Sequence, residues 1–415
     1  MAHVESHRTT LSNGLRVVVC PDHGSPNVTV DVMYHVGSFD ERAHRTGLAH
    51  LFEHLMFDNT TTGVDKQYDT LCTKAGGSNN AYTTYDYTNY YINLPAHQAE
   101  LGFWLEAERM KGFMITDHAL ETQRSVVIEE INQNVNNTPY GRWRFAQQAA
   151  AFDVRSSYSW EIYGSTEHVA SVSMDDARDF FDRYYAPKNA VLCVAGDITP
   201  EQAYLYAERH FGGISSRREE VARNGFDESW KLRGGHVVQT DAVTIPAVFI
   251  SFHIPGDRLM APQAGEVLAT LLGSGRTSAL YRSMVVDQRI ASSVGAYLDR
   301  RDHATLLTLY AFATTPVIEP AALAASMLTT AVECSPTEAS TMAAANKLAT
   351  STAMELQKNS GVADAVAWHT IFKDDPAYVN TLVDRYRSVT TESVDTLLRT
   401  YVVSENSVRV DVVPE

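Results

Sequence analysis

Two histidines and a glutamate lie close together near the start of the chain, at His50, Glu53 and His54. The histidines are four residues apart, so in a helix both imidazoles project from one face. Two neutral imidazoles at this spacing can bind one Zn²⁺ ion. Glu53 directly precedes the second histidine and can act as a base on a water molecule without binding the metal itself. These residues therefore predict a zinc site for hydrolysis.

The segment that carries these residues is expected to be an amphipathic helix. Between residues 47 and 57 the apolar residues recur at helical spacing, at Leu48, Leu51, Phe52, Leu55 and Met56. The order H-x-x-E-H is the reverse of the H-E-x-x-H motif of zinc proteases. The alternative is a surface helix that carries two histidines and a glutamate but no metal, because short motifs produce false positives.

Length and composition limit the classes of protein that fit. A chain of 415 residues is expected to form two or three domains. A net charge of −16 argues against a nucleic-acid partner, which would need a basic surface. Neither a transmembrane stretch nor a secretory signal is visible, so we expect a soluble protein of the bacterial cytoplasm or periplasm. The four cysteines are far apart and are expected to be buried thiols.

The pattern of apolar residues predicts an α+β fold, with β-rich stretches and helical stretches in alternation. Besides the metal helix, the expected strands of the first half are 15–19, 28–35, a pair within 79–95, and 190–195. The expected helices are 68–75, 101–110, 120–133 and 175–184. A polar stretch with little periodicity around 212–235 is expected to link two halves.

The second half repeats the first in outline. A helix that begins after Ser173 leads to a turn with Asn189 and then a strand, and the same order recurs after Thr390 and at Asn406. Thr390 follows Ser173 by 217 positions, and Asn406 follows Asn189 by the same number. We therefore expect a zinc-binding catalytic α+β domain (1–212), a linker (213–235) and a repeated α+β domain (236–415). Each would have a mainly antiparallel sheet covered by helices, forming half of a clam-like shell.

With these motifs, nearly the whole chain resembles the pitrilysin and insulinase family of zinc peptidases, in the branch of mitochondrial processing peptidase and its bacterial relatives. The segment Arg124-x-x-Val127-x-x-Glu130 resembles the one that holds the third metal ligand of this family, and Glu130 follows His54 by 76 residues. Two imidazoles and one carboxylate leave zinc the open position that catalysis requires. Glu129 projects elsewhere around the helix. Seven residues before the third ligand the family usually has a glutamate that supports the metal site, and this chain has Gln123 there.

The resemblance also implies a substrate-binding strand at Asn80, Ala81 and Tyr82. An extended peptide would add to the free edge of this strand and be held mainly by main-chain hydrogen bonds. Asn80 would add a side-chain contact. Its alternative role is that of a structural turn asparagine, since asparagine is common in turns.

In the second half the resemblance is incomplete. The segment 273–281 resembles the small-residue segment after which the family places an arginine and, seven residues later, a tyrosine that bind substrate and the developing oxyanion. The aligned positions are Val285 and Ser292, and Arg289 and Tyr297 are out of register. The chain is therefore expected to need a homologous non-catalytic subunit that supplies the Arg/Tyr pair. The alternative is that Arg289 and Tyr297 take this role despite their register, through a bulge in the strand.

The function that these observations favour is that of a zinc metalloendopeptidase, with one Zn²⁺ per chain, that hydrolyses unfolded peptides as the catalytic subunit of a hetero-oligomer. One alternative is a structural or core subunit of the same fold with little activity of its own. Another is a metal-dependent hydrolase that acts on a different class of substrate.

Overall fold

The computed structural model describes residues 3–58, 60, 67–216, 221 and 223–415. The chain forms two compact units, and each is built from three segments. The first unit contains residues 1–129, 162–224 and 352–382, and the second contains 130–161, 225–351 and 383–415. Arg217 to Glu220, within the expected linker, lie outside the described residues. Among the described residues, no helix is long and apolar enough to cross a membrane.

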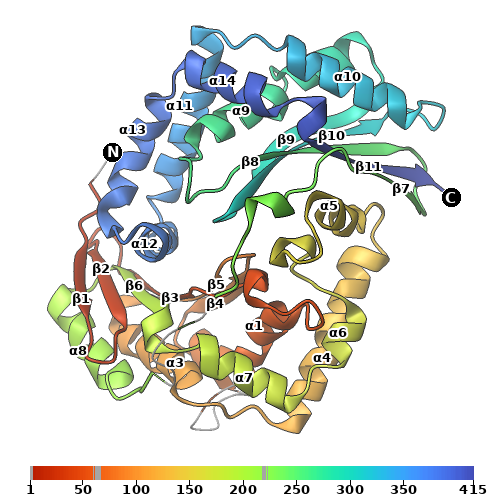
Figure 1. Cartoon of the computed structure of the whole chain (residues 1–415). Helices are drawn as coiled ribbons and strands as arrows, with labels where there is room; N and C mark the ends of the chain where they lie inside the picture. Colours follow the sequence, from red (N-terminus) through yellow and green to blue (C-terminus); the bar gives the residue numbers. More distant parts are fainter. Residues whose placement is uncertain (1–2, 59, 61–66, 217–220, 222) are drawn as a thin grey trace. The chain divides into compact units, whose positions relative to one another are not determined.

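The first unit is organised around a mixed six-stranded sheet with the order β1-β2-β6-β3-β5-β4 (Figure 1). Its strands are β1 (His7–Thr10), β2 (Arg16–Pro21), β3 (Asn27–Tyr34), β4 (Ser78–Thr83), β5 (Thr88–Pro95) and β6 (Ala190–Gly196). Only the pair of β2 and β6 is parallel. The central strand β6 is apolar and buried throughout, as expected of a strand covered on both faces. Strand β4 forms one edge.

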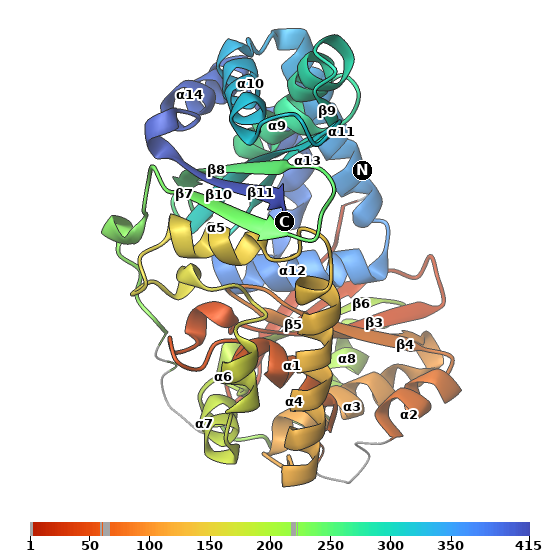
Figure 2. The same ribbon diagram turned by 90° about the vertical axis from the view of Figure 1, so that its right-hand side faces the viewer.

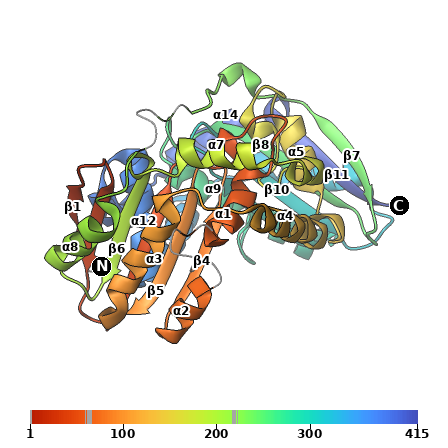
Figure 3. The same ribbon diagram turned by 90° about the horizontal axis from the view of Figure 1, so that it is seen from below.

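Helices cover both faces of this sheet. On one face α3 (Ala99–Lys111) packs on β3 and β5, and α8 (Pro200–Phe211) lies beside it on β2 (Figure 3). The helix α1 (Leu48–Asp58) packs against the edge strand β4 and also contacts α3. The opposite face is covered by α12 (Asn359–Lys373), which comes from late in the chain and lies across β6, β3 and β2 (Figure 2).

The remaining helices of the first unit complete its outer layer. These are α2 (Tyr68–Lys74), α6 (Thr166–Ala170), α7 (Met174–Tyr184) and most of α4 (Asp117–Ile131). Ser173 caps α7, since its hydroxyl accepts a hydrogen bond from the amide of Asp176, whose carboxylate accepts one in return. Alternation along β3 directs Val30 toward α3, whereas Met33 packs with Val366 and Ala367 of α12.

The second unit has a five-stranded sheet with the order β7-β11-β8-β10-β9. Its strands are β7 (His236–Asp241), β8 (Ala247–Pro255), β9 (Ala291–Asp299), β10 (Ala304–Ala313) and β11 (Ser407–Pro414). The helices α9 (Gln263–Gly273), α10 (Pro320–Glu333) and α14 (Thr391–Tyr401) pack together with these strands. The unit also contains α5 (Trp143–Ala151), α11 (Glu338–Glu355) and α13 (Leu382–Arg387), whose first residue falls in the first unit.

The predicted repeat is confirmed at the level of single hydrogen bonds. The ranges of α7 and α14 differ by the same 217 positions as their cap residues Ser173 and Thr390. The side-chain amide of Asn189 donates to the carbonyls of His35 and Tyr184. The amide of Asn406 donates in the same way to the carbonyls of His253 and Tyr401. The α+β fold of two similar halves, each with a mainly antiparallel sheet, is therefore confirmed.

The two halves of the chain each contribute one helical segment to the compact unit built mainly from the other half. The early segment that carries α5 packs on β7, β8 and β11 of the second sheet, whereas the late helix α12 packs on the equivalent strands of the first sheet. The strands of the two sheets fall on either side of the predicted linker 213–235. The predicted domain bounds 1–212 and 236–415 thus separate the sheets but not the helices, and as bounds of independent domains they stay a prediction.

Candidate metal centre

The expected metal helix is present as α1, with its apolar side chains buried as the periodicity predicted. Leu51, Phe52, Leu55 and Met56 are inaccessible to solvent, and His50 is 8% exposed. His54 and Glu53 are partly exposed. The imidazole rings of His50 and His54 lie side by side, with their centroids 4.9 Å apart and their planes nearly perpendicular.

The start of α1 is fixed by a carboxylate that the sequence did not single out. The two oxygens of the buried Glu41 accept hydrogen bonds from the amides of Gly47 (3.0 Å) and Ala49 (2.7 Å). A carboxylate at a helix N-terminus satisfies free amides and complements the helix dipole. Gly47 has a φ of +83°, and a Cβ atom there would lie 2.4 Å from the carbonyl oxygen of Tyr163. Only glycine therefore fits this turn without strain.

The loop before α1 is tied down by a distant segment. The guanidinium of Arg223 donates to the carboxylate of Asp40 at 2.8 Å. The side-chain amide of Asn224 donates to the carbonyls of Phe39 and Glu41, both at 2.8 Å. These contacts hold the capping residue in place, so the end of the first unit's central segment helps to position the metal helix.

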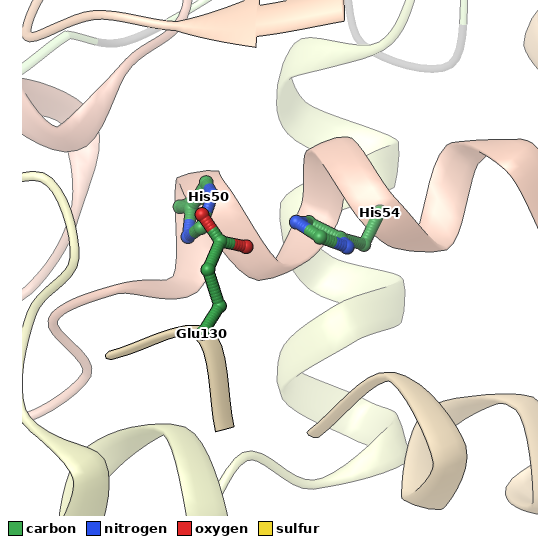
Figure 4. A group of neighbouring side chains, drawn as sticks. All are labelled: His50, His54 and Glu130. Carbon is green, nitrogen blue, oxygen red and sulfur yellow. The ribbon is translucent and has the colours of Figure 1, made fainter. Parts of the chain in front are cut away.

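The structure brings His50, His54 and Glu130 together (Figure 4). Their ligand atoms all lie within 4.8 Å of one another. Glu130 is in the last turn of α4, a helix that is continuous from the first unit and is followed by a π-helical turn, Asn132–Asn136. Glu130 is partly buried and its neighbour Glu129 is exposed, as expected for side chains that project to different sides of a helix.

Burial sets the protonation state of the first histidine. Desolvation, with a smaller contribution from the neighbouring His54, lowers the pKa of His50 to about 3. The imidazole is therefore neutral at physiological pH, which is the form that binds a metal ion. Two imidazoles and one carboxylate are a donor set that suits a catalytic zinc ion. Ligand atoms at about 2.0–2.2 Å from one ion lie within roughly 4.4 Å of each other, so the separation within 4.8 Å seen here needs only a small closure of the side chains to hold an ion.

Glu53 contacts the edge strand β4. The hydroxyl of Thr83 donates to Oε2 of Glu53 at 2.6 Å. Sequence reasoning placed Thr83 in the β-rich stretch but gave it no function. The alternation of side chains along the strand could have indicated it. Thr83 follows Tyr82, so its side chain projects to the face of the sheet opposite to that of Tyr82.

The three residues of the expected substrate strand all lie in β4, at the edge of the sheet. Asn80 is in the strand and not in a turn, and its side-chain oxygen accepts a hydrogen bond from the amide of Ala81 at 2.9 Å. Tyr82 donates to the carboxylate of Asp364 on α12. Among the described residues β4 has β5 as its one neighbour in the sheet, and the side chains of Asn80 and Tyr82 have partners within the chain.

Gln123, which stands where the family has a supporting glutamate, has a hydrogen-bond partner on the metal helix. Its amide donates to the carboxylate of Asp58, the last residue of α1, at 2.7 Å. This hydrogen bond of Gln123 is therefore with the end of the metal helix and not with a metal ligand. The pair connects α1 to α4, the two helices that carry the ligand group.

In the second unit, the positions aligned with the Arg/Tyr pair are engaged elsewhere. Val285 lies in a π-helical segment, Tyr281–Asp287. The hydroxyl of Ser292 donates to the carbonyl of Ala313 at 2.9 Å. Tyr297 is in β9, and the guanidinium of Arg144 lies 5.8 Å from the centre of its ring. Arg289 is exposed and has a φ of +57°.

Comparison with family models gives two matches. Residues 16–153 match the model described as insulinase, peptidase family M16. Residues 171–340 match the model described as peptidase M16 inactive domain. Both models belong to one peptidase family, and together they cover most of the chain.

Individual relatives agree with this result. The zinc protease PqqE of Helicobacter pylori is 30% identical over 286 residues, which cover 68% of this chain and 64% of that protein. An uncharacterized zinc protease of Mycobacterium leprae is 29% identical over 73% of this chain and 68% of its own length. The match thus spans less than two thirds of the Helicobacter relative. Among solved structures, a protease from Helicobacter pylori superposes over the full length of both chains with a TM-score of 0.91 at 24% identity.

Proposed function

This chain belongs to the pitrilysin and insulinase family, peptidase family M16, and we propose from that premise that it is a zinc metalloendopeptidase acting on unfolded peptides. The observation that carries the proposal is the convergence of His50, His54 and Glu130 beside Glu53. The relatives named above are zinc proteases, which supports the same class of activity.

The proposed ligands are His50, His54 and Glu130, with one Zn²⁺ per chain. When bound there, the ion would polarise the scissile carbonyl and make a water molecule more acidic. The donor set supports this assignment, because one neutral buried imidazole, a second imidazole and a carboxylate match the ligands of catalytic zinc sites.

Glu53 is the proposed general base. It would take a proton from the attacking water and pass it to the leaving nitrogen of the peptide. Its position on α1, one residue before His54, supports this role, as does the hydrogen bond that holds its Oε2. The other carboxylate oxygen is the one that we assign to proton transfer.

The proposed substrate is an extended peptide that adds to the edge of β4 along Asn80, Ala81 and Tyr82. Main-chain pairing reads few side chains, so cleavage should be broad in sequence but restricted to short or unfolded chains. The edge position of β4 and its contact with the metal helix support this placement.

We also propose that the active form is a hetero-oligomer. Val285 and Ser292 cannot replace an arginine and a tyrosine, because valine has no donor and the serine hydroxyl is short and bonded to Ala313. Loss of one oxyanion donor typically lowers turnover by about 10²–10³. A homologous subunit without H-x-x-E-H would supply the pair. The compartment, bacterial cytoplasm or periplasm, stays a prediction.

A structural or core subunit of the same fold is the second candidate. The match of residues 171–340 to a model described as an inactive domain favours it. The intact ligand group and Glu53 favour the catalytic role in the first half. The third candidate is a metal-dependent hydrolase that acts on a class of substrate other than peptides. Its products would not be peptide fragments.

The test measures bound metal and peptide cleavage in the purified chain, alone and with the chain encoded next to it. We expect about one zinc per chain, cleavage of quenched unfolded peptides that a chelator abolishes, and a steep rise in activity when the neighbouring chain is added. Full activity of the chain alone would contradict the hetero-oligomer. Zinc binding without any peptide cleavage in either preparation would contradict the peptidase.

A further inference from the structure

The edge strand β4 is held from both of its faces by consecutive residues. On one face the hydroxyl of Thr83 donates to Glu53 of α1 at 2.6 Å. On the other face the hydroxyl of Tyr82 donates to Asp364 of α12. The proposed base and a helix from the end of the chain are therefore connected through two adjacent residues of one strand.

The contact of Tyr82 is part of a larger polar cluster under α12. Tyr82 is the cross-strand partner of Asn89 in β5. The side-chain amide of Asn89 donates to Asp364 at 3.2 Å and to Asp31 of β3 at 2.9 Å. The cluster thus runs across three neighbouring strands and ends on the helix that covers them.

The burial of this cluster costs free energy unless its polar groups are hydrogen-bonded. Asp31 and Asn89 are almost inaccessible to solvent, and Asp364 and Tyr82 are half-buried. Desolvation, together with the neighbouring Asp364, raises the pKa of Asp31 well above its ordinary value. Desolvation also raises the pKa of Asp364, although the hydrogen bonds from Tyr82 and Asn89 oppose this shift. Two carboxyl groups therefore lie close together, and the donors on β4 and β5 are what offset their repulsion.

The cluster could attach α12 to the sheet without a contact to the edge strand β4. Asn89 alone already bridges the two carboxyl groups, and α12 packs on β3 and β6 through apolar residues such as Ala363 and Val366. The hydroxyl of Tyr82 adds a tie to the strand that has only one neighbour in the sheet. Besides its pairing with β5, this strand also contacts the helices α1 and α2.

We propose that Asp364 is a positioning residue for peptide binding, and that through Tyr82 it fixes the edge strand β4 in the position in which an extended peptide pairs with it. This inference rests on the proposed function and deepens it, because it assigns to a helix of the second half of the chain a part in the site of the first. Asp364 acts on the binding edge, and Thr83 acts on the base.

The two contacts predict different kinetic effects. In Tyr82→Phe and Asp364→Ala the edge strand loses its tie, so KM for unfolded peptides should rise on the order of 10-fold while kcat changes little. In Thr83→Ala the base loses its orienting donor, so kcat should fall on the order of 10-fold while KM changes little. Zinc content should stay at the wild-type value in all three variants.

Conservative variants and a matched control separate positioning from folding. Asp364→Asn keeps an oxygen that accepts from Tyr82, so its KM should stay close to that of the wild type. Thr83→Ser keeps the hydroxyl, so its kcat should stay close to that of the wild type. Tyr91→Phe is the control, because Tyr91 is a partly buried tyrosine on the neighbouring strand β5. A KM in Tyr82→Phe equal to that of Tyr91→Phe, or equal losses in Asp364→Ala and Asp364→Asn, would overturn the proposal.

A readout without activity keeps the test independent of the proposed function. Amide hydrogen exchange of residues 78–83 should speed up several-fold in Tyr82→Phe and Asp364→Ala, while exchange in β3 and β6 stays unchanged. If the wild-type chain cleaves no peptide but this exchange pattern appears, the proposed function fails and the positioning of β4 stands. If exchange in residues 78–83 is unchanged, the positioning role fails.

Discussion

The helices α1 and α9 occupy equivalent places in the two units, yet of these two helices only α1 carries proposed metal ligands. Each has 11 residues, follows a strand that lies two places from one edge of its sheet (β3 or β8), and packs on the strand at that edge (β4 or β9). When their first residues are aligned, Gly265, Leu268 and Ala269 of α9 stand where α1 has His50, Glu53 and His54.

The packing of the two helices differs in the same places. A Cβ atom on Gly273 would lie 2.0 Å from the backbone nitrogen of Ala296, and one on Gly265 would lie 2.9 Å from Leu298, so β9 approaches α9 closely. In the first unit a side-chain hydrogen bond from Thr83 to Glu53 spans the space between helix and strand. The comparison teaches that a site between this helix and the edge strand needs polar side chains and also a helix-to-strand distance large enough to accommodate them.

The opposite faces of the two sheets differ as well. Asp31 of β3 pairs with Cys193, and Phe249 of β8 pairs with Val410, which is 217 positions later, so the two residues are equivalent. Phe249 stacks on Trp143 of α5 with ring centres 4.0 Å apart. Asp31 instead faces the polar cluster under α12. The first unit therefore buries a carboxyl group where the second buries an aromatic pair.

The largest expected effect is that of removing the base from α1. Glu53→Gln should stay folded and keep zinc, but kcat should fall by about 10²–10⁴ because the proton acceptor is lost. The matched change on α9, Glu266→Gln, should leave kcat within about a factor of two. Peptide cleavage and metal analysis of both variants provide the check. Near-wild-type turnover in Glu53→Gln, or loss of its zinc, would refute the assigned role.

The next effect concerns the third ligand. Glu130→Gln should weaken zinc affinity by at least about 10–100-fold, because an amide is a poorer ligand than a carboxylate. Its exposed neighbour serves as the control, and Glu129→Gln should bind zinc as the wild type does. Competition with a chromophoric chelator measures both affinities. Equal weakening in the two variants would show that the ligand assignment is wrong.

A smaller effect is expected from Gly273→Ala. The added methyl group would press on the backbone of β9, so the free energy of unfolding of the second unit should fall by about 1–3 kcal/mol. Gly213→Ala is the control, because among the described residues no atom beyond the two adjoining residues lies within 4 Å of the Cβ position there. Denaturant unfolding of both variants tests the close approach. An unchanged stability in Gly273→Ala would mean that α9 and β9 are less tightly packed than the comparison requires.

The smallest expected effect is a change in the pH dependence of stability. The folded pKa of Asp31 is raised above its ordinary value of 3.8, so above that pH the folded state holds a proton that the unfolded state releases. Asp31 therefore lowers stability as pH rises through this window. Asp31→Asn should remove that loss and gain about 1 kcal/mol or more at pH 7, with little change near pH 3. A variant that is less stable at pH 7 would contradict the sign.

Much of the site could be predicted from local sequence. Spacing alone placed His50, Glu53 and His54 on one helix, and the apolar period identified its buried face, because both depend only on the geometry of a helix. The repeat was visible because each half needs the same cap, turn asparagine and strand. The resemblance supplied Glu130, which lies on another helix and could not be reached by spacing from α1.

Other features depend on contacts between residues that are far apart in the chain. Glu41 caps α1 and Arg223 holds the loop before it, yet neither belongs to a motif. The partner of Gln123 is Asp58, because α4 and α1 meet at that point. No local period could reveal these pairs, since hydrogen bonds between segments are set by packing.

By itself the sequence determined the candidate ligands on α1, the order of the elements and the repeat, because residue type, helical period and turn residues act over short distances. Only the tertiary structure decided which elements share a unit. It placed α12 from the second half of the chain on the first sheet, and so brought Asp364 to Tyr82. Apolar faces of helices are interchangeable in local sequence, and the choice between two similar sheets is made only when their side chains pack.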